Sequence, residues 1–216
     1  AGAASVSVAL DAAGQGTDAE FALSVAGADV TTLNISGTVG EEGGKLSLIS
    51  LPEELETVNL ELHSDTDIAA YSGAPNPATD VLTTVTTFDA SASTGDLVVG
   101  LAGLSALAAE TILLGSGDDS MSLSLGQLSA DELVVDLGAG DDTIAVNLGG
   151  GSETVLSISG GAGDDTFVFA GGNIALDDDE LEGSVTITDF NEGNNLLVIE
   201  DFDGFTAQTA VDNAIR

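Results

Sequence analysis

The segment Gly161-Ala-Gly-Asp-Asp-Thr-Phe167 occurs three times in this chain in nearly the same form. The earlier copies are Gly138-Ala-Gly-Asp-Asp-Thr-Ile144 and Gly115-Ser-Gly-Asp-Asp-Ser-Met121, and the first glycines are 23 residues apart in both intervals. Each copy joins a glycine-rich corner, where positive φ is permitted, to the start of an apolar segment. A fixed period of this length predicts a solenoid in which each repeat is one coil stacked on the next.

The residues after each corner alternate between apolar and polar side chains, which is typical of a strand with one buried face. The apolar members are Met121, Leu123 and Leu125, then Ile144, Val146 and Leu148, then Phe167 and Phe169. A second series of strand starts runs in phase with the first, at Thr32, Thr57, Thr84, Thr111, Leu133, Thr154 and Thr186. The sequence therefore predicts an all-β fold, a β-solenoid resembling a parallel β-helix or β-roll, with 21–32 residues and two strands per coil.

The solenoid is expected over residues 51–200. Residues 1–50 are less regular and predict either an irregular β cap or the first coils. Two prolines make residues 73–77 a loop, and the acidic run 177–180 predicts a solvated loop. Residues 201–216 are expected to form a terminal segment or a linker.

The composition combines extreme acidity with a high apolar content. The chain has 216 residues, 37 acidic and 2 basic side chains, a net charge of −35, and 43% hydrophobic residues. The apolar content argues against disorder. The acidity excludes nucleic acid as a natural partner and disfavours anionic membrane surfaces. No uninterrupted apolar run reaches the roughly 18 residues of a membrane span. Divalent cations remain as the expected partners.

Oxygen is the only abundant ligand atom. The chain contains no cysteine and one histidine, His63, so sites that need thiolate or several imidazoles are excluded. A Gly-x-Gly-Asp-Asp corner offers backbone carbonyls and a short carboxylate, and Ca²⁺ takes about 6–8 such oxygens. In the simpler alternative, each Asp only caps its own turn. Three copies in phase on an uncompensated acidic chain favour several calcium ions. Asp96 and the turn at residues 63–67 are weaker candidates.

The segment Gly160-Gly-Ala-Gly-Asp-Asp-Thr-Phe-Val168 resembles the repeats-in-toxin (RTX) nonapeptide, Gly-Gly-x-Gly-x-Asp-x-(large apolar)-x. Leu114 and Leu137 replace the first glycine in the other two copies. The resemblance implies that the sixth-position Asp binds calcium and that the eighth-position side chain points inward. The candidate metal-binding residues are Gly115, Gly117, Asp118 and Asp119; Gly138, Gly140, Asp141 and Asp142; and Gly161, Gly163, Asp164 and Asp165.

Residues 85–95 are similar to segments of RTX-type bacterial surface-layer proteins and large adhesins, and residues 185–193 resemble the strand and turn that commonly follow a last RTX repeat. The 23-residue spacing favours wide coils with a row of calcium ions along one corner, in the manner of surface-layer proteins. The resemblance implies a secreted, structural cell-surface module, exported by type I secretion, that folds on extracellular calcium and self-associates into a lattice or filament. No signal-peptide pattern follows Ala1, so the export signal is expected elsewhere in a longer protein.

Two other functions are alternatives. Threonine ladders on one face favour an adhesin domain that binds sugar or ice. Paired carboxylates could serve a polysaccharide-active β-helix enzyme, but the Asp pairs repeat as a scaffold would. Lys45, His63 and Arg216 are the only residues able to stabilise a developing anion. We therefore expect no enzymatic activity.

Overall fold

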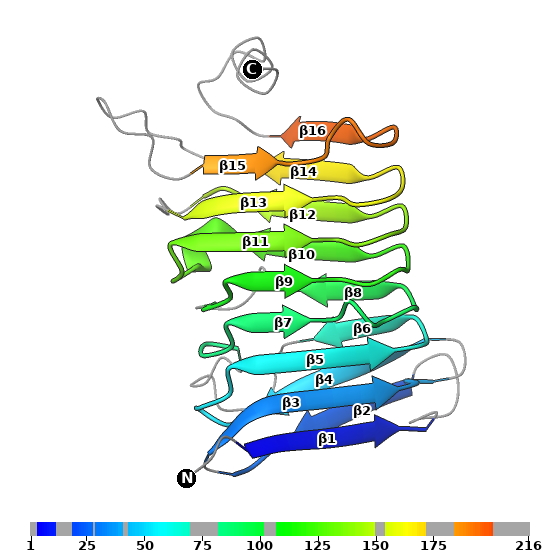
Figure 1. The fold of residues 1–216 in the computed structure, drawn as a ribbon, viewed down its shortest axis with the longest axis vertical. Helices are drawn as coiled ribbons and strands as arrows, with labels where there is room; N and C mark the ends of the chain where they lie inside the picture. The colour runs from blue at the N-terminus through cyan, green and yellow to red at the C-terminus, as the bar shows by residue number, and fades with distance from the viewer. Residues whose placement is uncertain are drawn as a thin grey trace.

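The computed structural model describes residues 4–11, 19–27, 29–40, 43–69, 82–101, 107–149, 154–171 and 184–200. These residues form two parallel eight-stranded sheets, and the chain crosses from one to the other with each successive strand (Figure 1). The predicted all-β solenoid is therefore confirmed. No helix in these ranges is long and apolar enough to cross a membrane.

Sheet A contains the odd-numbered strands, in the order β1 (Ala4–Leu10), β3 (Val30–Gly37), β5 (Thr57–Leu62), β7 (Thr87–Asp89), β9 (Thr111–Leu113), β11 (Glu132–Asp136), β13 (Val155–Ser159) and β15 (Ser184–Ile187). Sheet B contains β2 (Ala19–Ser24), β4 (Gly44–Ser50), β6 (Thr66–Ala69), β8 (Leu97–Gly100), β10 (Ser120–Ser124), β12 (Thr143–Asn147), β14 (Thr166–Ala170) and β16 (Leu196–Glu200). A single 3₁₀ turn, η1 (Leu125–Gln127), follows β10 in the part of the chain that is described. The less regular residues 4–50 thus contribute strands to the same two sheets as the later repeats.

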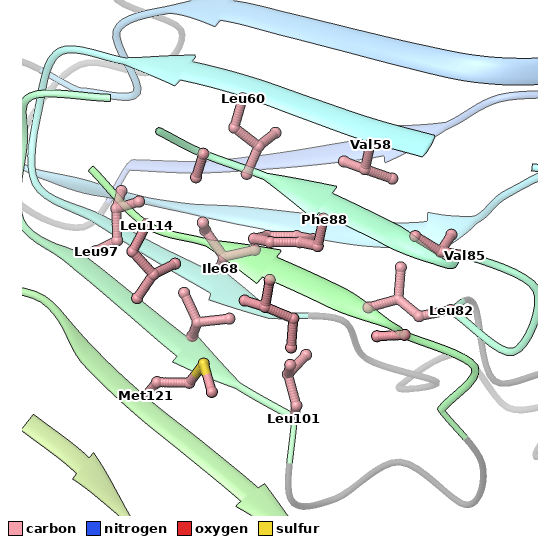
Figure 2. Packing of buried hydrophobic residues seen from close by; sticks show 14 of the residues in the cluster. Val58, Leu60, Ile68, Leu82, Val85, Phe88, Leu97, Leu101, Leu114 and Met121 are labelled. Atoms are coloured by element: carbon pink, nitrogen blue, oxygen red, sulfur yellow. The ribbon is translucent and has the colours of Figure 1, made fainter. Parts of the chain in front are cut away.

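The core is a set of apolar columns that run along the solenoid between the two sheets. One column in sheet A consists of Val6, Leu33, Val58, Phe88, Ile112, Val135, Ile158 and Ile187. Its counterpart in sheet B consists of Phe21, Leu46, Ile68, Val99, Met121, Ile144, Phe167 and Leu197. Side chains from both sheets meet in the space between them (Figure 2). Met121, Ile144 and Phe167 are at most 1% exposed, so the predicted inward positions are confirmed.

Two predicted strand starts lie outside their strands, in the corner just before them. Strand β7 begins at Thr87 instead of Thr84, and β13 begins at Val155 instead of Thr154. The hydroxyl of Thr84 donates a hydrogen bond to the Leu55 carbonyl at 2.9 Å, and that of Thr154 donates to the Ala130 carbonyl at 2.8 Å. Both threonines therefore tie a corner to the preceding coil. The loops predicted at residues 73–77 and 177–180, and the segment 201–216, lie outside the described residues.

Candidate metal-binding corners

The glycines of the repeated corners allow consecutive coils to approach closely. Gly161 has φ +88°, and a Cβ built on it would lie 1.9 Å from the Gly138 carbonyl oxygen. Gly138 has φ +101°, and a Cβ built on it would lie 2.0 Å from the Gly115 carbonyl oxygen. The first copy differs, because Gly115 is not in the left-handed region, yet a Cβ there would meet the Ser93 carbonyl oxygen at 2.3 Å. Glycine is thus required at these corners by backbone stacking, and in the later copies also by positive φ.

The second Asp of each corner forms a buried row. This inner row consists of Asp119, Asp142 and Asp165, which are 2%, 1% and 0% exposed. Each Oδ1 accepts a backbone N–H from the coil before it. The donors are Leu97 at 2.7 Å, Asp119 at 2.7 Å and Asp142 at 3.1 Å, respectively. The carboxylates therefore join neighbouring coils, which a turn that only capped itself would not do.

The first Asp of each corner forms an exposed row that bonds in the opposite direction. Each Oδ1 of this outer row accepts the N–H of the equivalent residue one coil later. The acceptor–donor pairs are Asp65–Asp96 (3.2 Å), Asp96–Asp118 (2.8 Å), Asp118–Asp141 (2.9 Å), Asp141–Asp164 (2.9 Å) and Asp164–Asn194 (3.0 Å). The twelve candidate residues are therefore brought together along one corner of the solenoid. The weaker candidates Asp65 and Asp96 extend only the outer row.

Two oxygens of the inner row are buried without a hydrogen-bond donor. Asp119 Oδ2 accepts the N–H of Gly115 at 3.1 Å. In the next two coils the equivalent N–H donates to a different carboxylate. The Gly138 N–H donates to Asp136 at 3.2 Å, and the Gly161 N–H donates to Asp189 at 2.7 Å. Asp142 Oδ2 and Asp165 Oδ2 are consequently unpaired. A buried carboxylate oxygen without a donor is unfavourable unless a proton or a cation neutralises it.

The electrostatics of the inner row favour neutralisation. Burial raises the pKa of Asp142 to about 7 and that of Asp119 to about 6, against an ordinary value of 3.8. Backbone N–H groups partly oppose these shifts, while neighbouring aspartates reinforce them. Burial also raises the pKa of Asp165. In the absence of a metal ion, burial therefore favours the protonated form of these carboxyls more than in an exposed aspartate.

The raised pKa values predict how the metal-free chain responds to pH. A carboxyl whose pKa is higher in the folded state binds more protons when folded, so stability falls as pH rises through the folded pKa. We expect the melting temperature in EDTA to fall between pH 5 and pH 8, which circular dichroism would measure. Ordinary exposed carboxyls are already ionised at pH 5 and add little to the change. A melting temperature that rises over this range would contradict the prediction.

Both rows end in asparagines that the sequence reasoning did not select. Gly193-Asn194-Asn195 lies 30 residues after Gly163-Asp164-Asp165, and Asn195 Oδ1 accepts the N–H of Asp165 at 2.8 Å, as an inner-row carboxylate would. Asn194 Nδ2 donates to both Asp164 oxygens at 3.1 Å, and this amide lowers the pKa of Asp164. The triplet Gly193-Asn194-Asn195 could have identified this corner from the sequence, because it repeats the Gly-Asp-Asp pattern with an amide in place of each carboxylate. The last corner is therefore neutral at both positions.

The geometry limits what kind of metal site this corner can form. Across the described ranges, no three Asp, Glu or His side chains converge on one point. His63 contacts Glu61 at 3.7 Å and Thr94 at 3.2 Å, and it joins neither row. A cation at the unpaired oxygens would therefore take its remaining ligands from backbone carbonyls, which suits an oxygen-preferring ion of tolerant geometry.

Comparisons with family models, with curated proteins and with solved structures find no match to this chain.

Proposed function

We propose that this chain is a calcium-binding structural module of a secreted bacterial cell-surface protein, such as a surface layer, fibre or adhesin. The observation that carries the proposal is the pair of buried, donorless oxygens, Asp142 Oδ2 and Asp165 Oδ2, in consecutive coils. Around them the net charge of the chain is −35, with only two basic residues to offset it. Cations supplied by the medium are the natural counter-charge.

Calcium fits these corners better than other metals. The available donors are carboxylate and carbonyl oxygens, which Ca²⁺ and Mg²⁺ both accept. Mg²⁺ demands a near-ideal small octahedron and keeps several waters, whereas Ca²⁺ tolerates irregular shells. The stacking of coils sets the position of each carboxylate, so a tolerant ion is favoured. In this proposal Asp119, Asp142 and Asp165 supply the side-chain oxygens, and the glycine corners supply carbonyls.

Calcium would couple folding of the module to its location. A solenoid coil cannot bury its apolar face alone, so the stack forms cooperatively or not at all. An ion that binds only the stacked corners adds its binding free energy to the stability of the fold. Where calcium is scarce, as in cytosol, the acidic chain would remain open and suited to type I export. Outside the cell it would fold and then self-associate.

The proposal predicts a calcium-specific gain of structure. EDTA-treated protein at pH 7.5 should gain β-strand circular dichroism on titration with Ca²⁺, and its melting temperature should rise by more than about 10 °C. Mg²⁺ at equal concentration should give less than half of that rise. A chain that is fully folded in EDTA and indifferent to calcium would show that the corners are held by hydrogen bonds and protons alone.

One observation favours the second candidate, an adhesin domain that binds sugar or ice. Thr32, Thr57, Thr87 and Thr111 stand opposite one another on four consecutive strands of sheet A, with their side chains directed outward. The row is half-buried and continues into Val134, which interrupts it. Binding to polysaccharide or to ice that is lost in Thr57→Leu and Thr87→Leu, but retained in Thr84→Leu, would favour this function.

A further inference from the structure

The two ends of the solenoid expose side chains that belong to the core. Val6 and Val8 of β1 point inward but are only half-buried, whereas Leu33 and Ile35 on the next strand are at most 1% exposed. At the opposite end, Ile199 of β16 is 39% exposed. In Figure 1 these ends lie at the bottom and the top of the stack. Each apolar column is therefore covered on one side only within the described residues.

The same ends present unpaired backbone groups. Strands β1 and β15 are the outermost strands of sheet A, and β2 and β16 are those of sheet B. In the described part of the chain, each of these four strands pairs with a single neighbour. The outer N–H and C=O groups of such an edge form a template for another strand. Each end offers one edge from each sheet, so a suitable partner must supply two strands at the same separation, each parallel to the edge strand that it joins.

We propose that copies of this chain stack end to end, with β15 on β1 and β16 on β2 of the next copy. The opposite end of the same solenoid has the required two strands and the required separation. The proposal deepens the self-association described above and rests on that part of the proposed function, independently of the calcium ligands. Two copies would continue both sheets without a change in coil geometry.

The register of the sheets supports this pairing. Extending each column by one coil places Ile187 opposite Val6 of the next copy, and Leu197 opposite Phe21. In the same register, Ile199 lies opposite Leu23 of the next copy. The partly exposed apolar side chains of the β15–β16 end thus meet apolar side chains of the other end. Burying them removes apolar surface from water, which stabilises the contact.

Within the four end strands, no like charges face each other. The four end strands contain only two charged side chains, Glu20 and Glu200. In the extended register, Glu20 lies opposite Leu196 and Glu200 lies opposite Ser24, so no like charges face each other. The last inner-row position is the neutral Asn195. In a chain of net charge −35, these strands can therefore pair without a direct like-charge contact between them.

Parallel strands make the contact directional. Because the two ends differ, the interface is heterologous, and an interface of this kind that does not close a ring generates a filament. A two-fold contact between identical ends would instead place strands antiparallel, and the columns would not continue. End-to-end stacking therefore predicts an open series of oligomers rather than a closed dimer.

Complementary variants of the full chain test the proposal. Val6→Lys blocks the β1 end and Ile199→Lys blocks the β16 end, because an inward lysine at an edge prevents strand addition. Ser7→Lys and Val198→Lys place the same charge on the outward faces of the same strands as controls. Circular dichroism in calcium establishes that each variant is folded. Sedimentation velocity over a concentration series then gives the oligomeric state.

We expect the wild-type chain and both controls to form a concentration-dependent series of oligomers. Each blocked variant alone should associate at least tenfold more weakly, while an equimolar mixture of the two should form dimers and nothing larger. A monomeric wild-type chain, or a blocked variant that dimerises alone, would overturn end-to-end stacking. Calcium-induced folding without association would refute end-to-end stacking and leave the calcium proposal intact. Association without a calcium response would refute the calcium proposal and leave end-to-end stacking intact.

Discussion

The triple variant Asp119→Asn, Asp142→Asn, Asp165→Asn is expected to be more stable than the wild-type chain at pH 8 without metal, and to lose the response to calcium. Asparagine keeps the Oδ1 acceptor that joins each coil to the one before it, as Asn195 does at 2.8 Å from the Asp165 nitrogen. It removes three buried negative charges, two of them on carboxyls with a donorless oxygen, at the cost of the hydrogen bond from the Gly115 N–H to Asp119 Oδ2. Removal of an uncompensated buried charge relieves a cost of several kcal/mol.

The size of the effect follows from linkage. A site that is saturated at about 1,000 times its Kd stabilises the folded state by about 4 kcal/mol. For a chain of this length, each kcal/mol corresponds to about 2–4 °C in melting temperature. We expect the metal-free variant to melt at least about 5 °C above the wild type and to shift by less than about 3 °C with calcium. Thermal melts in EDTA and in millimolar Ca²⁺ measure both quantities.

The outer row provides the matched control. Asp118→Asn, Asp141→Asn, Asp164→Asn removes the same formal charge from the same three corners but leaves the unpaired inner oxygens in place. This variant should retain most of the calcium response, because its carboxylates are exposed. If the inner-row variant is destabilised in EDTA as well as in calcium, the buried carboxylates act only as hydrogen-bond acceptors. The calcium proposal would then fail at its central residues.

Gly161→Ala is expected to destabilise the solenoid strongly. The new Cβ would lie 1.9 Å from the Gly138 carbonyl oxygen, and the backbone at φ +88° disfavours any L side chain. The contact with Gly138 is relieved only by separating two coils, and the unfavourable backbone conformation would remain. We expect a loss of more than about 4 kcal/mol in the free energy of unfolding, which is exceptional for one substitution. Urea denaturation in calcium measures it.

Gly100→Ala is the control for this substitution. Gly100 lies in strand β8, has no positive φ, and has no atom within 4 Å of an added Cβ. We expect it to change the free energy of unfolding by less than about 1 kcal/mol. Equal effects at the two positions would show that backbone stacking at the corners does not limit the stability of the fold.

The parts of this structure that could be predicted from sequence are those with a strict local period. Alternation after each corner identified the inward side chains of β10, β12 and β14 because strand geometry sends successive side chains to opposite faces. The strand starts at Thr84 and Thr154 were wrong. Threonine has a strand preference, but in a corner its hydroxyl can satisfy a carbonyl of another coil, and that contact is not local. The asparagine corner was missed because an amide was not counted as an equivalent of a carboxylate.

The repeats and the apolar alternation in the sequence were sufficient to predict a solenoid, the residues that turn its corners, and the apolar side chains that face inward. The solenoid follows from the 23-residue repeat, whereas the corners and the inward positions depend on glycine conformation and on the two-residue period of a strand, both of which act within a few residues. Only the tertiary structure decided that the two aspartate rows bond in opposite directions and that Asp142 and Asp165 each retain a buried, unpaired oxygen. Those oxygens lack donors because Asp136 and Asp189 accept the N–H groups of Gly138 and Gly161. For Asp165 the competing acceptor, Asp189, lies 28 residues after Gly161 in the next coil, so this competition exists only once the coils are stacked. For Asp142 the competing acceptor, Asp136, lies two residues before Gly138, and the outcome depends on the folded shape of that corner.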